Sequence, residues 1–461
     1  MDTINLDVGT PSEDFGAVDF GDARLNKRLR KTVEKMTKNS QDSILGAVKE
    51  RFSAKGFYRL LGNAKFSLEK MLEAVKAATI ARIVALQLVM VLLIQDTTDL
   101  NLNSHKKTEG LGYSSENVRG VKVHSCAAVT PDGLPIGLVS QSYETREEPK
   151  SSLTAAEKAA RPIEEKESFR WIDMLRDSIS GMPEGIVVIT ICDREGDFYE
   201  LYAEAIELNT DFIIRVVHNR KTQDNDKVID KIHRAKPIGE RVVVNIPRDT
   251  EKNIPARTVE MEIAFCKVTI KKPQNVNSEN SPDSITMNVV RITEVDENGV
   301  VEDGIEWILA TSLPINSAED AKRIVEFYVQ RWKIERYHFV LKSGCNVEKI
   351  QQRTFERIKP VILIYSVIAM FIMLITLIGR VIPDAPCSLF FDEDEWKILF
   401  KVVNKTTAPD KPYSMADAVK YLGELGSYKR APSDGPPGLK SIWKGLCKLY
   451  EFINLYNSLR M

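Results

Sequence analysis

The sequence predicts an α/β protein that carries an antiparallel β insertion and has helical regions at both ends. Two apolar runs, 89–100 and 184–197, have the length of buried strands, and each carries an aspartate after its apolar stretch. Residues 222–304 are extended segments separated by Pro, Asn and Ser clusters, a pattern typical of antiparallel strands. Helical periodicity dominates the first 75 residues and the segment after 316, so helices should flank the strands.

The composition is that of a globular protein with several structural units. The chain has 461 residues, about three times a typical domain of ~150 residues, and 43% of them are hydrophobic. These values exclude global disorder, collagen-like repeats and a small disulfide scaffold. The nearest pair of cysteines, Cys345 and Cys387, is 42 residues apart, so the sequence has no C-x-x-C zinc motif. A net charge of -1 argues against a uniformly basic nucleic-acid wrapper, although local patches stay possible.

Residues 21–60 form the first element, a basic helical segment. They contain eleven Lys and Arg residues against four acids, a local charge of +7. Apolar residues recur every three or four positions from Leu25 to Met36, and Asp22 precedes them as a helix N-cap. The other face of this helix is basic, and aromatic residues interleave with basic ones at 51–59, which favours nucleic-acid binding over a merely solvated face. The candidate DNA contacts on the helix are Lys27, Arg28, Arg30 and Lys31.

Strands dominate the middle of the chain. The first buried strand is expected to end at Asp96 and the second at Asp193, because both apolar runs turn polar there. A hairpin is expected around the turn TPDG at 130–133. The other expected elements are helices at 167–179 and 194–208 and strands at 211–217, 240–248, 257–270, 285–295 and 305–312.

A long helix and a long apolar run follow the insertion. Residues 317–343 contain neither Gly nor Pro and carry acids early, which predicts an uninterrupted helix. Residues 361–378 carry no charge over 18 residues, which is long enough to cross a membrane. Because no other segment is comparably apolar, we expect a buried core helix and no stable membrane association. The acidic N-terminus has no apolar signal region, so a cytoplasmic protein is expected.

Carboxylates and a polar helix face define the candidate site. Asp96 and Asp193 at strand ends would lie at one edge of a sheet, where ligands of open α/β sheets collect. A polar stripe on the long helix has spacings of 3, 4, 3 and 4, which put its members on one helix face. This stripe consists of Tyr328, Arg331, Glu335, His338 and Lys342.

The chemistry of three carboxylates in one site points to divalent cations. Such carboxylates repel one another at neutral pH unless cations lie between them. Oxygen ligands without clustered Cys or His favour Mg²⁺, with Mn²⁺ as a substitute, over zinc. Two ions about 4 Å apart would activate a water or a 3′-hydroxyl and stabilise the leaving oxygen of a phosphodiester. Asp96, Asp193 and Glu335 therefore indicate a nuclease or strand-transferase site.

These motifs resemble those of bacterial DDE transposases of the insertion-sequence IS-four family, which includes Tn-five-like transposases. Asp96 in QDTTDL, Asp193 in CDREGD and Glu335 in a Tyr-Arg-Glu-Lys helix match the triad of that family, at spacings of 97 and 142 residues. The resemblance covers nearly the whole chain, from GDARLNKRLRK near the N-terminus to KSIWKGL near the C-terminus. One departure is Gly196, which replaces the alanine of the DREAD-type motif.

The resemblance implies a ribonuclease-H-like catalytic core and a role for each matching residue. The three acids are implied to be ligands of two Mg²⁺ ions. The signature residues would hold the DNA end and its flipped nucleotide, and Trp307 would stack on the flipped base unless it is a plain core residue of its strand. His338 has the geometry of the site face, with a structural role as its alternative. The implied DNA contacts are Tyr328, Arg331, Lys342, Trp307, Arg215 and Arg220.

The function implied by the resemblance is cut-and-paste DNA transposition. The chain would bind double-stranded DNA at terminal inverted repeats, cleave the ends through a hairpin intermediate, and join them to target DNA. A homodimer in a paired-end complex, associated with the bacterial nucleoid, would carry out these steps. Three alternatives stay open: a catalytically silent DNA-binding derivative, a ribonuclease-H-like nuclease with another role, and a membrane-associated protein based only on the apolar run.

The expected domains follow the order of these elements. They are a helical DNA-binding domain at 1–75, a first part of the catalytic core at 76–221, a β insertion at 222–304, a second part of the core with the signature helix at 305–380, and a helical dimerisation region at 381–461.

Overall fold

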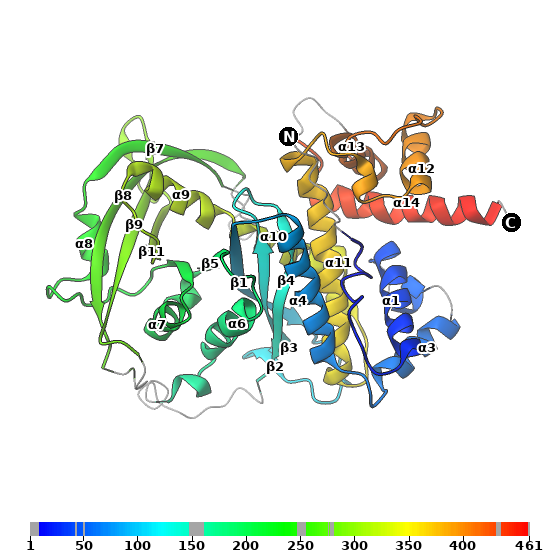
Figure 1. Ribbon diagram of the computed structural model, residues 1–461, viewed down its shortest axis with the longest axis horizontal. Helices are drawn as coiled ribbons and strands as arrows, with labels where there is room; N and C mark the ends of the chain where they lie inside the picture. The colour runs from blue at the N-terminus through cyan, green and yellow to red at the C-terminus, as the bar shows by residue number, and fades with distance from the viewer. Residues whose placement is uncertain are drawn as a thin grey trace.

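The computed structural model describes residues 9–41, 44–48, 51–146, 161–246, 255–274, 276, 281–429 and 435–459 of the protein (Figure 1). Its helices include α1 (Ala23–Lys38), α2 (Ile44–Val48), α3 (Arg51–Leu61), α4 (Leu68–Ala85), α6 (Phe169–Ile179), α7 (Tyr199–Glu207), α8 (Val228–His233), α9 (Ala318–Val329), α10 (Trp332–Phe339), α11 (Phe355–Val381), α12 (Glu393–Asn404), α13 (Met415–Leu425) and α14 (Leu439–Leu459). Its strands are β1 (Met90–Asn101), β2 (Tyr113–Ser115), β3 (Val118–Val129), β4 (Pro135–Glu144), β5 (Val187–Cys192), β6 (Asp211–Arg215), β7 (Pro237–Ile246), β8 (Arg257–Lys271), β9 (Ser284–Asp296), β10 (Gly299–Val300) and β11 (Glu306–Thr311).

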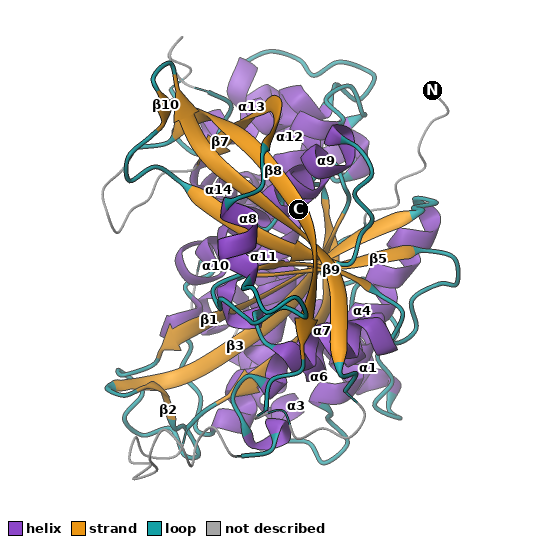
Figure 2. Cartoon of the chain, turned by 90° about the vertical axis from the view of Figure 1, so that its left-hand side faces the viewer, coloured by secondary structure: helices purple, strands orange, loops and turns teal. Residues whose placement is uncertain are grey.

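The described strands form a single sheet with two differently built parts (Figure 2). In the first part, β1 pairs antiparallel with β3 and parallel with β5, and β5 pairs parallel with β6. In the second part, β11, β9, β8 and β7 follow one another as antiparallel neighbours. Because β11 also pairs with β6, the insertion extends the core sheet rather than forming a separate one.

Helices cover both faces of the first part of the sheet, and the side chains of β1 alternate between them. Leu92 and Ile94 pack in the same cluster as α11, whereas Val91 and Leu93 pack with Met174 of α6. Figure 1 shows α4 and α11 on one side of these strands and α6 on the other. This arrangement explains the continuous apolar run of the strand, since both faces of β1 are buried.

The apolar run 361–378 lies within α11, a core helix of the protein. By length and composition α11 could cross a membrane, but 94% of its most apolar 18-residue window is buried inside the protein. Its buried side chains belong to a cluster that also contains residues of the N-terminal helices, the core sheet and α14. Protein contacts on all sides therefore account for a helix that is apolar all round.

The helical regions at the two ends of the chain contact each other. The Asp22 side chain accepts a hydrogen bond from the Arg24 backbone N–H, so the predicted N-cap of α1 is confirmed. Lys38 Nζ, near the end of α1, lies 5.9 Å from the ring centroid of Tyr450 in α14. Figure 1 shows α1 beside α14 accordingly. The domain boundary expected at 75/76 falls inside α4, whose Thr79 hydroxyl donates to the Leu138 carbonyl of β4, so α4 is attached to the core sheet.

Three predicted elements differ from the structure. β1 does not end at Asp96 but continues to Asn101, because its antiparallel pairing with β3 persists. The helix expected over 317–343 is divided, since i→i−3 hydrogen bonds such as Arg331 N–H to the Tyr328 carbonyl tighten the chain between α9 and α10. The helix expected over 194–208 begins as a 3₁₀ turn, and α7 starts only at Tyr199.

Candidate active site and DNA-binding surfaces

Asp96 and Asp193 are brought to the same level of the sheet by the register of β1 and β5. Ile94 of β1 pairs with Ile191 of β5, and each aspartate lies two residues beyond its member of that pair. The two carboxylates therefore lie side by side as predicted, but the reason differs from the predicted one. The parallel pairing of β1 with β5 ends there, whereas the strand β1 itself does not.

Glu335 approaches this position from α10, which packs against β1. The Arg331 guanidinium forms an ion pair with Glu335 and lies 3.9 Å from the Asp96 carboxylate. His338 Nδ1 lies 3.8 Å from the same carboxylate. The predicted stripe is thus present on one helix face despite the division of the helix, and its central residues face Asp96.

The electrostatics of the site are those of incompletely neutralised carboxylates. Burial raises the pKa of Asp96 to about 7; Arg331 opposes this, while Asp193 and Glu335 add to it. Burial also raises the pKa of Asp193. Burial, with Lys342 and Arg331 nearby, lowers the pKa of His338 to about 3, so this imidazole is neutral at pH 7. An added cation between the acids would lower the pKa values of both aspartates.

The residues present fit a divalent cation by their ligand chemistry, although the three acids do not converge on one point. Among the described residues, no group of three His, Cys, Asp or Glu side chains is close enough to hold a metal ion. Glu335 is paired with Arg331 instead, and its side chain is 48% exposed, which leaves it free to reorient. His338 Nε2 is buried without a hydrogen-bond partner in the described part of the chain, which indicates a polar site that the protein alone does not satisfy.

Trp307 lies in an aromatic cluster behind the signature helix. Its ring centroid is 5.5 Å from that of Tyr328 and 5.7 Å from that of Trp332, both in edge-to-face geometry. Trp307 is only 5% exposed and Tyr328 only 3%, so neither ring offers an open face. Stacking of a flipped base on Trp307 would require this cluster to open first.

The remaining predicted contacts from the core fall into two groups. Arg215 in β6 donates to the Glu306 carbonyl. Burial, with the positive charges of Arg194 and Arg331 nearby, lowers the pKa of Arg215, so its side chain borders the site. Lys342 is partly exposed in a π-helical segment, Val340–Gly344, that follows α10. Arg220, by contrast, is held in an ion pair with Asp197, whose carboxylate is fully buried. The guanidinium of Arg220 is thus already paired within the protein, and its contact with DNA stays a prediction.

The basic face of α1 is present as predicted. Leu25, Leu29, Val33 and Met36 are buried on the inner face of α1. The four basic candidates point away from this core and are exposed: Lys27, Arg28, Arg30 and Lys31.

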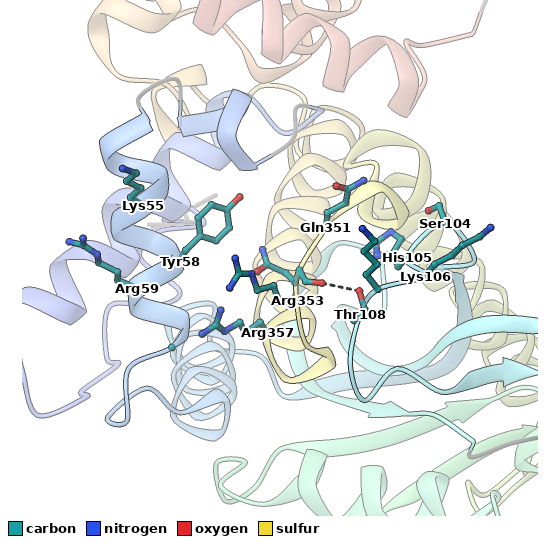
Figure 3. A pocket seen from close by; sticks show the side chains of 13 residues that line it. Lys55, Tyr58, Arg59, Ser104, His105, Lys106, Thr108, Gln351, Arg353 and Arg357 are labelled. Atoms are coloured by element: carbon teal, nitrogen blue, oxygen red, sulfur yellow. Dashed lines mark hydrogen bonds between the residues drawn. The ribbon is translucent and has the colours of Figure 1, made fainter.

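A basic cleft lies between α3 and the catalytic core (Figure 3). Its volume is about 1090 Å³, and it is lined from α3, from the loop after β1 and from the segment that leads into α11. Six Lys and Arg residues line this cleft, and its lining includes no Asp or Glu: Lys55, Arg59, Lys106, Lys107, Arg353 and Arg357. No ion pair of these six occurs among the described residues, so their charge is available to a ligand.

Sequence reasoning missed this cleft and one residue behind the active site. Lys106 and Lys107 are adjacent in sequence, and Arg353 and Arg357 are four apart, but only the fold brings the two pairs together. The other missed residue is Arg170, which the KESFRW motif offered without any sign that its side chain would be buried. No local pattern announces either arrangement, because both depend on contacts between distant segments.

Comparison with known families assigns the chain. Residues 11–66 match the transposase DNA-binding family, residues 170–371 the transposase DDE domain and residues 367–459 the Tn5 transposase dimerisation domain. The chain belongs to the DDE transposases of the Tn5 type, and its function is DNA transposition. The predicted family and the ribonuclease-H-like fold class are thereby confirmed. Among solved structures, a piggyBac transposase synaptic complex with hairpin DNA is similar at 10% identity and a TM-score of 0.36, over 96% of this chain and 72% of that one.

Proposed function

We propose that this transposase works by a cut-and-paste route and that Asp96, Asp193 and Glu335 hold two Mg²⁺ ions. The observation that supports this site is the β1–β5 register, which sets two half-buried aspartates level with each other opposite α10. When bound, such ions activate an attacking oxygen and stabilise the leaving oxygen of a phosphodiester. Mn²⁺ should substitute, because oxygen ligands of this kind accept both metals.

The role of Arg331 follows from its two carboxylate partners. Without bound metal or DNA, the positive charge of Arg331 partly neutralises the carboxylates of Asp96 and Glu335. The ion pair between Arg331 and Glu335 must open before all three acids can share cations. Once released from Glu335, the guanidinium can bind a phosphate of the DNA end, as Tyr328 and Lys342 border the same face. The signature helix thus exchanges an internal ion pair for contacts with metal and DNA.

The proposed reaction is a series of phosphodiester exchanges. Water attacks the phosphodiester at the element end and releases a 3′-hydroxyl. This hydroxyl attacks the opposite strand to form a hairpin, and a second water opens the hairpin and regenerates the 3′-hydroxyl. The 3′-hydroxyl finally attacks target DNA and displaces a strand of it. Each step forms one P–O bond and breaks another, so the four steps can share one site.

The DNA end is proposed to run from α1 across the basic cleft to the acidic site. The cleft adjoins the region that matches the DNA-binding family, since Lys55 and Arg59 lie on α3. Lys106 and Lys107 follow β1, which carries Asp96, so the cleft also adjoins the catalytic core. A groove lined by basic residues from both regions suits the regularly spaced phosphates of a duplex.

Dimerisation is proposed to use the exposed end of α14. Phe452, Leu455 and Leu459 recur at helical spacing and are 39%, 56% and 78% exposed. They lie within the segment that matches the dimerisation family. A partner chain that covers this stripe would complete a paired-end complex, which we place at the nucleoid of a bacterial cytoplasm.

The experiment that tests the proposed function uses the DNA that flanks the coding region. Matching inverted repeats on both sides give the substrate, and the purified protein should cleave it with Mg²⁺ or Mn²⁺ and produce a hairpin on a denaturing gel. End binding without cleavage at any metal concentration would indicate a silent derivative. Cleavage of DNA regardless of the repeat sequence would indicate a nuclease with another role.

A further inference from the structure

Arg170, near the start of α6, is a charged residue buried behind the acidic site. Its side chain is only 6% exposed, which is unusual for Arg unless the guanidinium is fully partnered. It donates to the Thr97 hydroxyl at 3.2 Å, the Glu195 carboxylate at 2.7 Å and the Glu167 carbonyl at 2.7 Å. Two of these three partners follow closely after the catalytic aspartates in sequence.

Each of those two partners also contacts an aspartate directly. The Thr97 backbone N–H donates to Asp96 Oδ1 at 2.9 Å, and the Glu195 backbone N–H donates to Asp193 Oδ1 at 2.9 Å. Arg170 therefore ties together the two residues whose N–H groups orient the two carboxylates. It does so from the α6 side of the sheet, opposite the face that α10 covers.

A chain of hydrogen bonds continues from Arg170 into the sheet. Thr97 Oγ1 lies 2.8 Å from His124 Nδ1, and His124 Nε2 lies 3.3 Å from Gln95 Oε1. Burial, followed by the charges of Arg170 and His338, lowers the pKa of His124, so its ring is neutral. The Thr97 hydroxyl, which accepts from Arg170, then donates to His124 Nδ1, while Nε2–H donates to Gln95. Each hydrogen bond from Arg170 to Gln95 thus has a defined donor and acceptor, and together they hold the Thr97 side chain in place.

We infer that Arg170 is a positioning residue that sets the spacing of Asp96 and Asp193 for cation binding. This inference rests on the proposed function, because it assigns Arg170 to the same metal site. Arg170 touches neither the metal nor DNA in this role. It acts through Thr97 and Glu195, in the way that outer residues orient the ligands of other metal sites.

The test compares two variants of Arg170 with a matched control on the same helix. Arg170→Met keeps the length of the side chain and removes the bridge, and Arg170→Lys retains a charge. Arg176→Met breaks the ion pair between Arg176 of α6 and Glu204 of α7, whose atoms are 2.8 Å apart and which involves neither Thr97 nor Glu195. Mn²⁺ affinity is measured by electron paramagnetic resonance, and amide exchange of Thr97 and Glu195 is measured in the metal-free protein.

The expected result separates positioning from general stability. Arg170→Met should weaken Mn²⁺ binding by about 10–100-fold, and Arg170→Lys should have an intermediate effect. Arg176→Met should bind Mn²⁺ as tightly as wild type. The affinity for DNA should not change in any of these variants. Amide exchange at Thr97 and Glu195 should become faster in Arg170→Met without any metal. If Arg170→Met does not fold, Glu195→Ala removes the acceptor at the exposed end of the bridge, keeps the backbone N–H at 195, and should weaken Mn²⁺ binding in the same direction.

Three outcomes would overturn the inference, and a fourth concerns the proposed function alone. Unchanged Mn²⁺ affinity in folded Arg170→Met, or equal losses in Arg170→Met and Arg176→Met, would reduce Arg170 to an ordinary structural ion pair. Unchanged amide exchange would do the same. Absence of Mn²⁺ binding by the wild-type protein would instead refute the proposed metal site, and amide exchange would still decide whether Arg170 orders the two aspartate loops.

Discussion

The acidic site and the basic cleft are both charged, but the protein neutralises them to different extents. In the acidic site, Arg331 bridges Asp96 and Glu335, and burial holds the pKa of Asp96 at about 7. In the cleft, six basic side chains have no ion pair among the described residues. In the acidic site, the proposed metal ions would have to displace the Arg331 guanidinium from Glu335, whereas the basic side chains of the cleft are open to a ligand at once. Binding of DNA should therefore be separable from cleavage.

Loss of one proposed catalytic aspartate should separate DNA binding from cleavage most strongly. Asp193→Asn should lower the cleavage rate at least about 100-fold, because a metal ligand contributes several kcal/mol to the transition state. End binding, measured by gel shift, should stay within a few fold of wild type. Asp197→Asn is the matched control from the same motif. It should lower the melting temperature instead, because Asp197 accepts buried hydrogen bonds from Val217 N–H and His218 N–H. Equal cleavage by Asp193→Asn and wild type would remove Asp193 from the site.

A core substitution in α11 should destabilise the whole fold, and with it both the acidic site and the basic cleft. Leu363 is fully buried, so Leu363→Ala should lower the free energy of unfolding by about 2–5 kcal/mol. The same substitution at Leu45, which is 51% exposed, should change it by less than about 0.5 kcal/mol. Urea unfolding of protein purified without detergent measures both values. Similar small effects at the two positions would contradict a core role for this helix and revive the membrane alternative.

Neutralisation of the cleft should weaken DNA binding and leave the chemistry of bound DNA intact. Arg353→Gln with Arg357→Gln should reduce the slope of log K against log salt by about 1.8, since each phosphate contact contributes about 0.9. The rate of cleavage at saturating protein should not change. Arg323→Gln with Lys420→Gln removes two exposed charges elsewhere and should leave the slope as it is. A slope unaffected by the cleft substitutions would place the DNA path outside the cleft.

The raised pKa of Asp96 gives the smallest expected effect, a pH dependence of stability in metal-free buffer. The folded protein binds this proton up to about pH 7, whereas the unfolded chain releases it near the ordinary value of 3.8. The contribution of protonated Asp96 to the free energy of unfolding is therefore complete at low pH and is lost as the pH rises toward 7. Between pH 5 and 8, wild type should lose about 1 kcal/mol or more relative to Asp96→Asn. A pH-independent difference between the two proteins would show that Asp96 is already ionised at pH 5.

Features that depend on a local pattern of residues could be predicted from the sequence. Apolar runs predicted β1 and β5, and the 3-4 spacing of the stripe predicted the face of α10 that meets Asp96. Contacts between distant segments could not be predicted in this way. The pair of Arg220 with Asp197, the burial of Trp307 and the bridge made by Arg170 each depend on how separate elements pack. The basic cleft likewise exists only because α3, the loop after β1 and the start of α11 converge.

The most direct test of the central claim is metal binding by the acidic site itself. Electron paramagnetic resonance of Mn²⁺ added to the purified chain requires no knowledge of the DNA sequence. We expect saturable Mn²⁺ binding that Mg²⁺ displaces and that Asp96→Asn, Asp193→Asn and Glu335→Gln each weaken by at least about tenfold. Equal Mn²⁺ affinity in wild type and all three variants would contradict the assignment of these acids as the metal site.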